Sequence, residues 1–206
     1  MTLPPSFGSA GEHRLQQYLG TADRADRFYD QQVRAHLTPE MRDFISRQAM
    51  VFLATADSHG ECDASFRAGP PGFVHVIDER TLTYPEFRGN GVLASAGNML
   101  ENPHLGMLFV DFTHHHLGLH VNGVARLHDD DELRRSHPDL PRDTAPGRTP
   151  HLWVHLTVEE AYIHCSKHIP HMEPAPRPGS HDAARPKDTH YFTRPPAAYA
   201  PSPSVT

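Results

Sequence analysis

Two segments of the chain combine an arginine with glycines in a way that suits anion binding. Residues 65–73, SFRAGPPGF, end a predicted strand near Arg67 and continue into a stretch where a ligand could approach the main chain. Residues 84–91, YPEFRGNG, place Arg88 and Asn90 just before a predicted helix. A guanidinium group binds phosphate through two hydrogen bonds, and free N–H groups at a helix start add positive charge. The two segments predict a phosphate site, with a plain turn between strands as the alternative for the first.

Histidines form a second candidate site. In a strand, His114, His116 and His120 would share one face while His115 would face away. Three imidazoles could hold zinc, but no Cys-x-x-Cys or His-Glu-x-x-His motif accompanies them, so an exposed polar loop is the favoured interpretation and no metal is assigned. Further along, the segment 164–168, HCSKH, offers a cation and a thiol that would be nucleophilic only with a lowered pKa.

Composition narrows the class of protein. A length of 206 residues suits one domain with tails. The net charge of −6 argues against general nucleic-acid binding, which needs clustered lysine and arginine. Two cysteines, Cys62 and Cys165, are expected to be free thiols in a reducing cytoplasm. No signal peptide is visible and no apolar run could span a bilayer, so we expect a cytoplasmic protein without a membrane partner.

Apolar periodicity predicts helices followed by a mainly β domain. We expect a disordered leader over residues 1–8 and helices within 9–48, one of them starting at Thr38-Pro39. Further helices are predicted over 91–101 and 130–136. Strands are predicted over residues 50–55, 61–67, 73–77, 81–84, 105–112, 117–127 and 152–162.

The short connections between these strands favour an antiparallel barrel of about six strands, spanning residues 49–169. A parallel sheet fits poorly because long helices do not separate the strands. Residues 170–206 are rich in proline and are expected to be disordered or to lie over a partner subunit. Truncation after Glu173 should therefore leave the melting temperature nearly unchanged.

Taken in order, these segments resemble the FMN-binding split β-barrel family of pyridoxamine 5'-phosphate oxidases, from about residue 42 to residue 167. The resemblance rests on FLATADSHGE, SFRAGPPGF, LTYPEFRGNG, NMLENPHLGMLF, LHVNGVARL and YIHCSKHIP. It implies a mainly β, six-stranded antiparallel split barrel with N-terminal helices, and a homodimer that binds FMN between its subunits. The apolar faces of Leu105–Val110 and Leu117–Val121 are expected near that interface.

The resemblance also implies which residues would bind the cofactor. The phosphate would meet Arg67 and Arg88, with neutral donors beside them, and the ring would lie over the main chain of residues 68–70. Lys167 would place a charge near N1 of the reduced ring. The full set is Ser65, Arg67, Ala68, Gly69, Pro70, Thr83, Tyr84, Arg88, Asn90 and Lys167.

Three departures from the family limit the functional prediction. Asn90 stands where the oxidases carry a lysine, and Gly118 stands near the place of a glutamine that reaches the flavin. The family's substrate-binding C-terminal end has no counterpart in the proline-rich tail. The prediction is an FMN-dependent oxidoreductase acting on a small molecule, with no catalytic residue assigned. The alternatives are a flavin- or haem-binding sensor or store, and a deazaflavin-dependent reductase.

Overall fold

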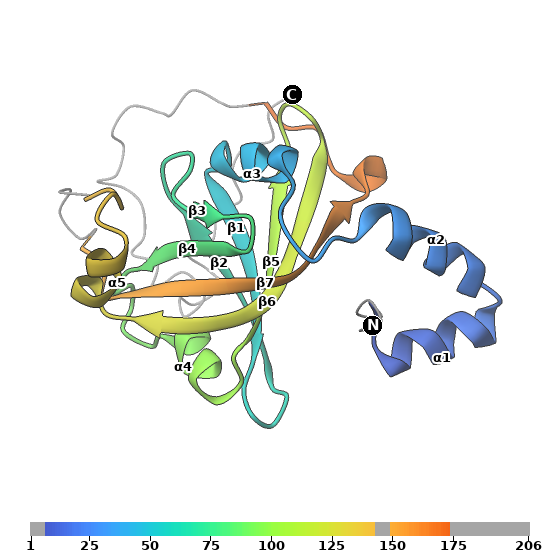
Figure 1. Cartoon of the computed structure of the whole chain (residues 1–206), viewed down its shortest axis with the longest axis horizontal. Coiled ribbons are helices and arrows are strands. Elements are labelled where there is room, and N and C mark those ends of the chain that lie inside the picture. Colours follow the sequence, from blue (N-terminus) through green and yellow to red (C-terminus); the bar gives the residue numbers. More distant parts are fainter. Residues whose placement is uncertain (1–6, 143–148, 174–206) are drawn as a thin grey trace, which may run out of the picture. The chain divides into compact units, whose positions relative to one another are not determined.

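The computed structural model describes residues 7–142 and 149–173, and within these ranges seven strands form one antiparallel sheet (Figure 1). The strands are β1 (Met50–Ala56), β2 (Cys62–Ala68), β3 (His75–Asp78), β4 (Thr81–Glu86), β5 (His104–Asp111), β6 (Leu117–His128) and β7 (Leu152–His164). Their order is β2-β1-β5-β6-β7-β4-β3, and the described edge strands β2 and β3 do not pair with each other. The mainly β split-barrel fold is thereby confirmed. The seven strands correspond to the seven ranges predicted from the sequence, one more than the six expected for the barrel, and the short edge strand β3 overlaps the predicted range 73–77.

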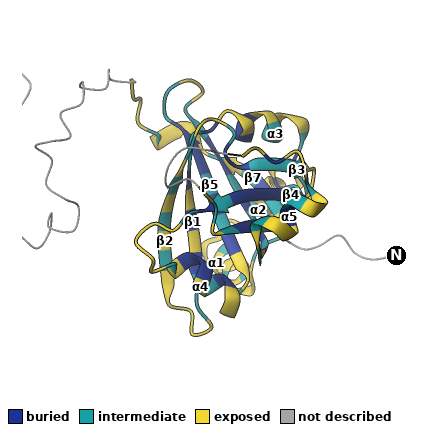
Figure 2. Ribbon diagram, turned by 90° about the vertical axis from the view of Figure 1, so that its left-hand side faces the viewer, coloured by how far each residue is buried: buried dark blue, intermediate teal, exposed yellow. Residues whose placement is uncertain are grey.

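Alternating side chains build the core on one side of this sheet. In β1, Val51 and Leu53 are buried while Phe52 and Ala54 are exposed, as a strand with one covered face requires. Buried side chains from the other strands, including Phe109 and Leu156, complete the same apolar cluster. Figure 2 shows this buried interior enclosed by exposed loops and helices.

Five helices are described around the sheet: α1 (Ala10–Leu19), α2 (Ala22–Gln32), α3 (Pro39–Ser46), α4 (Ala94–Glu101) and α5 (Asp130–Ser136), with a 3-10 turn at Ser166–His168. The predicted start at Thr38 is confirmed, because its hydroxyl accepts a hydrogen bond from the N–H of Met41. Every residue of α1 and α2 is at least partly exposed, and Phe28 of α2 packs edge-on against Tyr162. No helix in the described ranges is long and apolar enough to cross a membrane.

Several sequence expectations fall at the margins of the described chain. Most of the leader over residues 1–8 and most of the tail over residues 170–206 lie outside the described residues. The helix expected from residue 91 begins only at Ala94, because Gly91 and Leu93 adopt left-handed conformations with φ of 81° and 53°.

Both cysteines are free, as predicted, and both are exposed.

Gly123 marks the point where the longest strand pair changes register. The pairing of β6 with β7 shifts between Asn122 and Gly123, and a Cβ atom at Gly123 would collide with the main-chain carbonyl of Thr157. We therefore expect Gly123→Ala to lower the free energy of unfolding by about 1–3 kcal/mol, measured by urea denaturation. Gly97→Ala is the matched control, because a Cβ atom added there would meet no other atom within 4 Å and a helix favours alanine. Equal stability of the two variants would contradict the close approach.

Candidate functional site

A cavity of about 460 Å³ lies between β2, the end of β4 and the start of α4. We call it the β2–α4 cavity. Its lining comprises Asp63, Ser65, Phe66, Arg67, Glu86, Phe87, Arg88, Gly89, Asn90, Val92, Leu93, Ala94 and Ser95. Four residues predicted to bind phosphate, Ser65, Arg67, Arg88 and Asn90, are thus brought together from two separate segments.

The local structure explains how these side chains reach one place. Asp63, Ser65 and Arg67 alternate along β2 and share its more buried face. After β4 the chain turns sharply: the side-chain oxygen of Asn90 accepts a hydrogen bond from the N–H of Val92 at 3.0 Å. Gly89 permits the turn with φ of 50°. The turn leaves the amide group of Asn90 as a hydrogen-bond donor.

Arg67 is held by a carboxylate that sequence reasoning did not identify. Its Nε donates to Oε2 of Glu86 at 3.0 Å, and its Nη2 lies 3.0 Å from the same oxygen. Glu86 is buried, so this pair neutralises most of the local charge of Arg67. The remaining N–H groups of the guanidinium stay available, apart from one that donates to the main-chain oxygen of Phe66.

A second carboxylate faces the cavity from β2. Asp63 accepts hydrogen bonds from the hydroxyl of Ser65 at 2.7 Å and from the hydroxyl of Ser95 at 3.0 Å. These two hydrogen bonds, that from Ser65 first, hold the pKa of Asp63 below its usual value. Asp63 therefore carries a negative charge near neutral pH and orients both hydroxyls toward itself.

The charge balance singles out Arg88. Two guanidinium groups and two carboxylates line the β2–α4 cavity among the described residues, so its formal charge is near zero. Arg88 makes no ion pair within the described ranges, whereas Arg67 does. The donor set suits a phosphate monoester, because it offers free guanidinium N–H groups, two hydroxyls and an amide. Asp63 and Glu86 oppose a dianion, so the fit depends on the positive charge of Arg88, which no described carboxylate pairs with.

Other predicted site residues lie elsewhere. Ala68, Gly69 and Pro70 line a neighbouring cavity of about 300 Å³ that shares Phe87 with the first. Lys167 is exposed in the turn after β7 and lines neither cavity.

Thr83 and Tyr84 are buried in the core and also line neither cavity. The hydroxyl of Thr83 donates to the main-chain oxygen of Val154 at 2.9 Å. The hydroxyl of Tyr84 is buried without a partner among the described residues, and burial raises its pKa well above the usual range. The structure therefore does not bring these two side chains to the predicted phosphate site, because three successive residues of β4, Leu82 to Tyr84, are buried.

The outer face of the sheet carries a row of large side chains in register. Phe66 pairs with Phe52, Phe52 with Leu108, Leu108 with His120, and His120 with Tyr162. We call these five residues the outer row. Phe52 and Phe66 are 40% and 51% exposed, which is unusual for adjacent aromatic rings on a strand pair.

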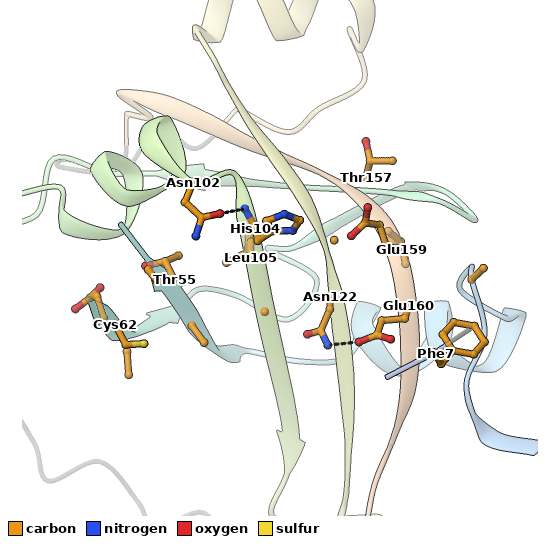
Figure 3. A pocket seen from close by; sticks show the side chains of 18 of the residues that line it. Phe7, Thr55, Cys62, Asn102, His104, Leu105, Asn122, Thr157, Glu159 and Glu160 are labelled. Carbon is orange, nitrogen blue, oxygen red and sulfur yellow. Dashed lines mark hydrogen bonds between the residues drawn. The ribbon is translucent and has the colours of Figure 1, made fainter. Parts of the chain in front are cut away.

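Beside the outer row lies a groove of about 1040 Å³, and its floor consists of small residues, among them Ala54, Ala64 and Gly106. Figure 3 shows Asn122 donating to Glu160 across this groove, a hydrogen bond of 2.8 Å. The expected interface faces at Leu105–Val110 and Leu117–Val121 need correction here. Their apolar members at alternate positions, such as Met107 and Val121, are buried in the core of the single chain. The opposite side of these strands faces the outer row and most of the groove, which Leu105 also lines near the start of β5.

The histidine segment forms the exposed loop that the sequence favoured. His114 and His115 lie in a turn rather than a strand, because the Asp111 carboxylate accepts hydrogen bonds from the N–H groups of Thr113, His114 and His115 at 2.9–3.0 Å. His120 points away from that turn: its Nε2 lies 2.9 Å from Nδ1 of His164, and its ring stacks on Tyr162. The three-histidine zinc site weighed over His114, His116 and His120 is therefore wrong in its geometry.

A sequence model of the family described as pyridoxamine 5'-phosphate oxidase matches residues 37–165, well over half of the chain. The chain belongs to this family. The matched range contains the whole sheet and both lining segments of the β2–α4 cavity. No curated protein matches the chain.

Solved structures with a related fold have low sequence identity to this chain. HupZ from Group A Streptococcus is 21% identical, with 62% of this chain and 93% of HupZ covered and a TM-score of 0.46. A candidate pyridoxamine 5'-phosphate oxidase from Lactobacillus delbrueckii is 23% identical, covers 63% and 95%, and has a TM-score of 0.48. HutZ, the haem storage protein from Vibrio cholerae, is 14% identical, covers 62% and 94%, and has a TM-score of 0.41.

Sequence reasoning missed the two carboxylates and Ser95. A signal for Asp63 was present, because it stands two and four residues before Ser65 and Arg67 on a predicted strand. The sequence contained a weaker indication for Glu86. Its contact with Arg67 arises because the paired strand β4 ends close to β2, which is apparent only in the folded sheet. The position of Ser95 in the cavity depends on where α4 begins. The left-handed conformation of Leu93, just before the helix, sets that start.

Proposed function

We propose that this protein binds FMN, with the phosphate in the β2–α4 cavity, and acts as an oxidoreductase on a small molecule. The observation that carries the proposal is that one cavity collects Ser65, Arg67, Arg88 and Asn90 from segments some twenty residues apart. Family membership supports the same cofactor.

The residues that would hold the phosphate differ in the charge that they contribute. Arg88 would supply the unneutralised positive charge, and Arg67 would add N–H groups while Glu86 keeps it in place. Ser65 and Ser95 would turn their hydroxyls from Asp63 to the ligand. The neighbouring cavity at Ala68–Pro70 would take the next part of the molecule. When bound, FMN supplies hydride transfer through its ring, and the protein supplies orientation and charge.

The direct test is the absorbance spectrum of the purified protein, with mass spectrometry of the released ligand. Flavin bands and the mass of FMN would support the proposal. If the protein is colourless and takes up a deazaflavin but not FMN, the cofactor is a deazaflavin and the assigned fold is unaffected. A protein that binds neither would overturn the proposal.

A second candidate, haem binding, is favoured by one observation. His120 stands on the outer row beside Leu108 and Phe52, so an imidazole borders an exposed apolar surface that could receive a porphyrin. HutZ, whose fold is related, is a haem storage protein. A Soret band that disappears in His120→Ala and persists in Arg88→Ala would favour this candidate over FMN.

We further propose a homodimer formed through the outer row, because a stable monomer rarely leaves neighbouring aromatic rings exposed. We expect light scattering to give a dimer for the wild type and a monomer for Phe52→Asp, since a charge at the centre of an apolar contact is desolvated without a partner. Leu100→Asp is the control, because Leu100 is 76% exposed on α4, and it should remain dimeric. A wild-type protein that is monomeric at micromolar concentration with its cofactor bound would contradict this proposal.

A further inference from the structure

Three histidines meet at the end of the sheet next to α5. His128 ends β6, His137 directly follows α5, and His155 lies on β7. The ring of His155 stands between the other two, with centroids 5.5 Å from His128 and 6.1 Å from His137. All three are half-buried, and His128 and His155 come from strands that pair directly with each other.

The two separations from His155 are close to those of imidazoles that share a metal ion. A zinc–nitrogen bond of 2.0–2.1 Å places each imidazole centroid about 3.2 Å from the metal, so two ligands at a tetrahedral angle have centroids about 5 Å apart. The observed distances exceed that value by roughly an ångström or less. The rings of His128 and His155 lie at 76° and those of His137 and His155 at 18°, so binding would require ring rotation but no movement of the strands.

His155 has the properties of a ligand without a partner. Its Nδ1 is buried and makes no hydrogen bond to any described residue. A buried polar atom in this state usually has a water or an ion as its partner. Burial is the main cause that lowers the pKa of His155.

Glu132 supplies the outer contact that metal-binding histidines normally have. Its carboxylate lies 3.2 Å from Nδ1 of His128, one helical turn along the chain. This pairing fixes the proton on Nδ1 and leaves Nε2 with its lone pair free for coordination.

We propose that His128, His137 and His155 form a binding site for zinc or a similar divalent transition metal, with Glu132 orienting His128. Three protein nitrogens leave the fourth tetrahedral position to water or another small ligand. The bound ion would join α5 and the residue after it to the paired strands β6 and β7. This site shares no residue with the β2–α4 cavity, so it stands independently of the proposed FMN binding.

The test is a titration of the untagged full-length protein with Zn²⁺ against a chromophoric chelator, and with Co²⁺ followed by absorbance and fluorescence. Trp153 is the only tryptophan of the chain and is the pairing partner of His128 on β7, so Co²⁺ at this site should quench its emission. We expect one saturable site, and an affinity at least about ten-fold weaker in both His137→Ala and Glu132→Gln. Glu132 is exposed, so its variant should fold normally.

The protein has 18 histidines, so controls must separate this site from surface binding. His59→Ala and His120→Ala should bind Zn²⁺ as tightly as the wild type, and Co²⁺ should still quench Trp153 in both. The proposal is overturned if no saturable site exists, if His137→Ala retains wild-type affinity, or if His120→Ala is the variant that loses the metal.

Discussion

Arg88→Ala is expected to raise the dissociation constant for FMN about ten- to a hundred-fold, while leaving that for riboflavin nearly unchanged. A hydrogen bond to a charged group contributes about 1.5–3 kcal/mol, and riboflavin lacks the phosphate that would receive it. The measurement is a titration of apo-protein with each flavin, followed by flavin fluorescence. The effect should weaken with added salt, because part of it is the attraction between exposed charges.

Arg88 is a better test of the site than Arg67 for a physical reason. Arg67→Ala would leave the buried carboxylate of Glu86 without its partner, and removing one member of such a pair destabilises the fold itself. Arg88 has no such partner among the described residues, so its loss should act on the ligand alone.

The matched controls for Arg88→Ala are Arg47→Ala and His115→Ala. Arg47 pairs with the exposed Asp43 on α3, and His115 lies in the turn after β5, so neither lines the β2–α4 cavity. Both should bind FMN like the wild type. If Arg88→Ala also binds FMN like the wild type, the phosphate site lies elsewhere. If His115→Ala is the variant that loses FMN, the histidine turn takes part in binding and the placement of the phosphate in the β2–α4 cavity is wrong.

The sequence predicted the sheet well because apolar runs bounded by turn residues mark the strands. The run Met50–Ala54 reads as a buried strand, and the structure pairs it with residues 64–68, close to the predicted second strand. The helix boundary at Thr38 was predictable because a capping residue marks it. The start of α4 was not, because Leu93 adopts a left-handed conformation that no local signal announces.

The candidate site was only partly predictable, because charge pairing depends on contacts between distant strands. Arg67 and Arg88 stand out as cations beside glycines in the sequence. Glu86 neutralises Arg67 and not Arg88. This difference follows only from the placement of β4 against β2. Likewise, the resemblance marked Tyr84 as a ligand position, but the structure directs its side chain into the core.

Asp111 explains why the histidine segment forms the exposed loop that the sequence favoured. A strand would have placed His114 and His116 on one face with His120. Instead one carboxylate accepts three main-chain N–H groups and closes a turn. Asp followed by polar residues is a known turn signal, and it agrees with the exposed loop that was favoured over a metal site.

Trp153→Ala is expected to lower the free energy of unfolding by about 3–5 kcal/mol, the largest effect we predict for a single substitution. The indole is 1% exposed and forms its own cluster with Leu133 and Leu140. Its Nε1 donates to the carboxylate of Asp130 at 2.7 Å, and the guanidinium of Arg134 lies 5.5 Å from the ring centroid.

The substitution therefore removes apolar burial, a charged hydrogen bond and a cation–π contact at once. For a domain of this size the melting temperature should fall by roughly 10–15 °C, measured by circular dichroism because the variant has no tryptophan to report. Tyr18→Ala is the control, since Tyr18 is 84% exposed on α1 and should change stability by no more than about 0.5 kcal/mol. Trp153→Phe separates the contributions: it keeps most of the apolar burial and loses the bond to Asp130, so we expect about 1–3 kcal/mol. If Trp153→Ala unfolds at the wild-type temperature, α5 does not pack on β7 as described, and the histidine cluster that depends on the same packing would lose its support.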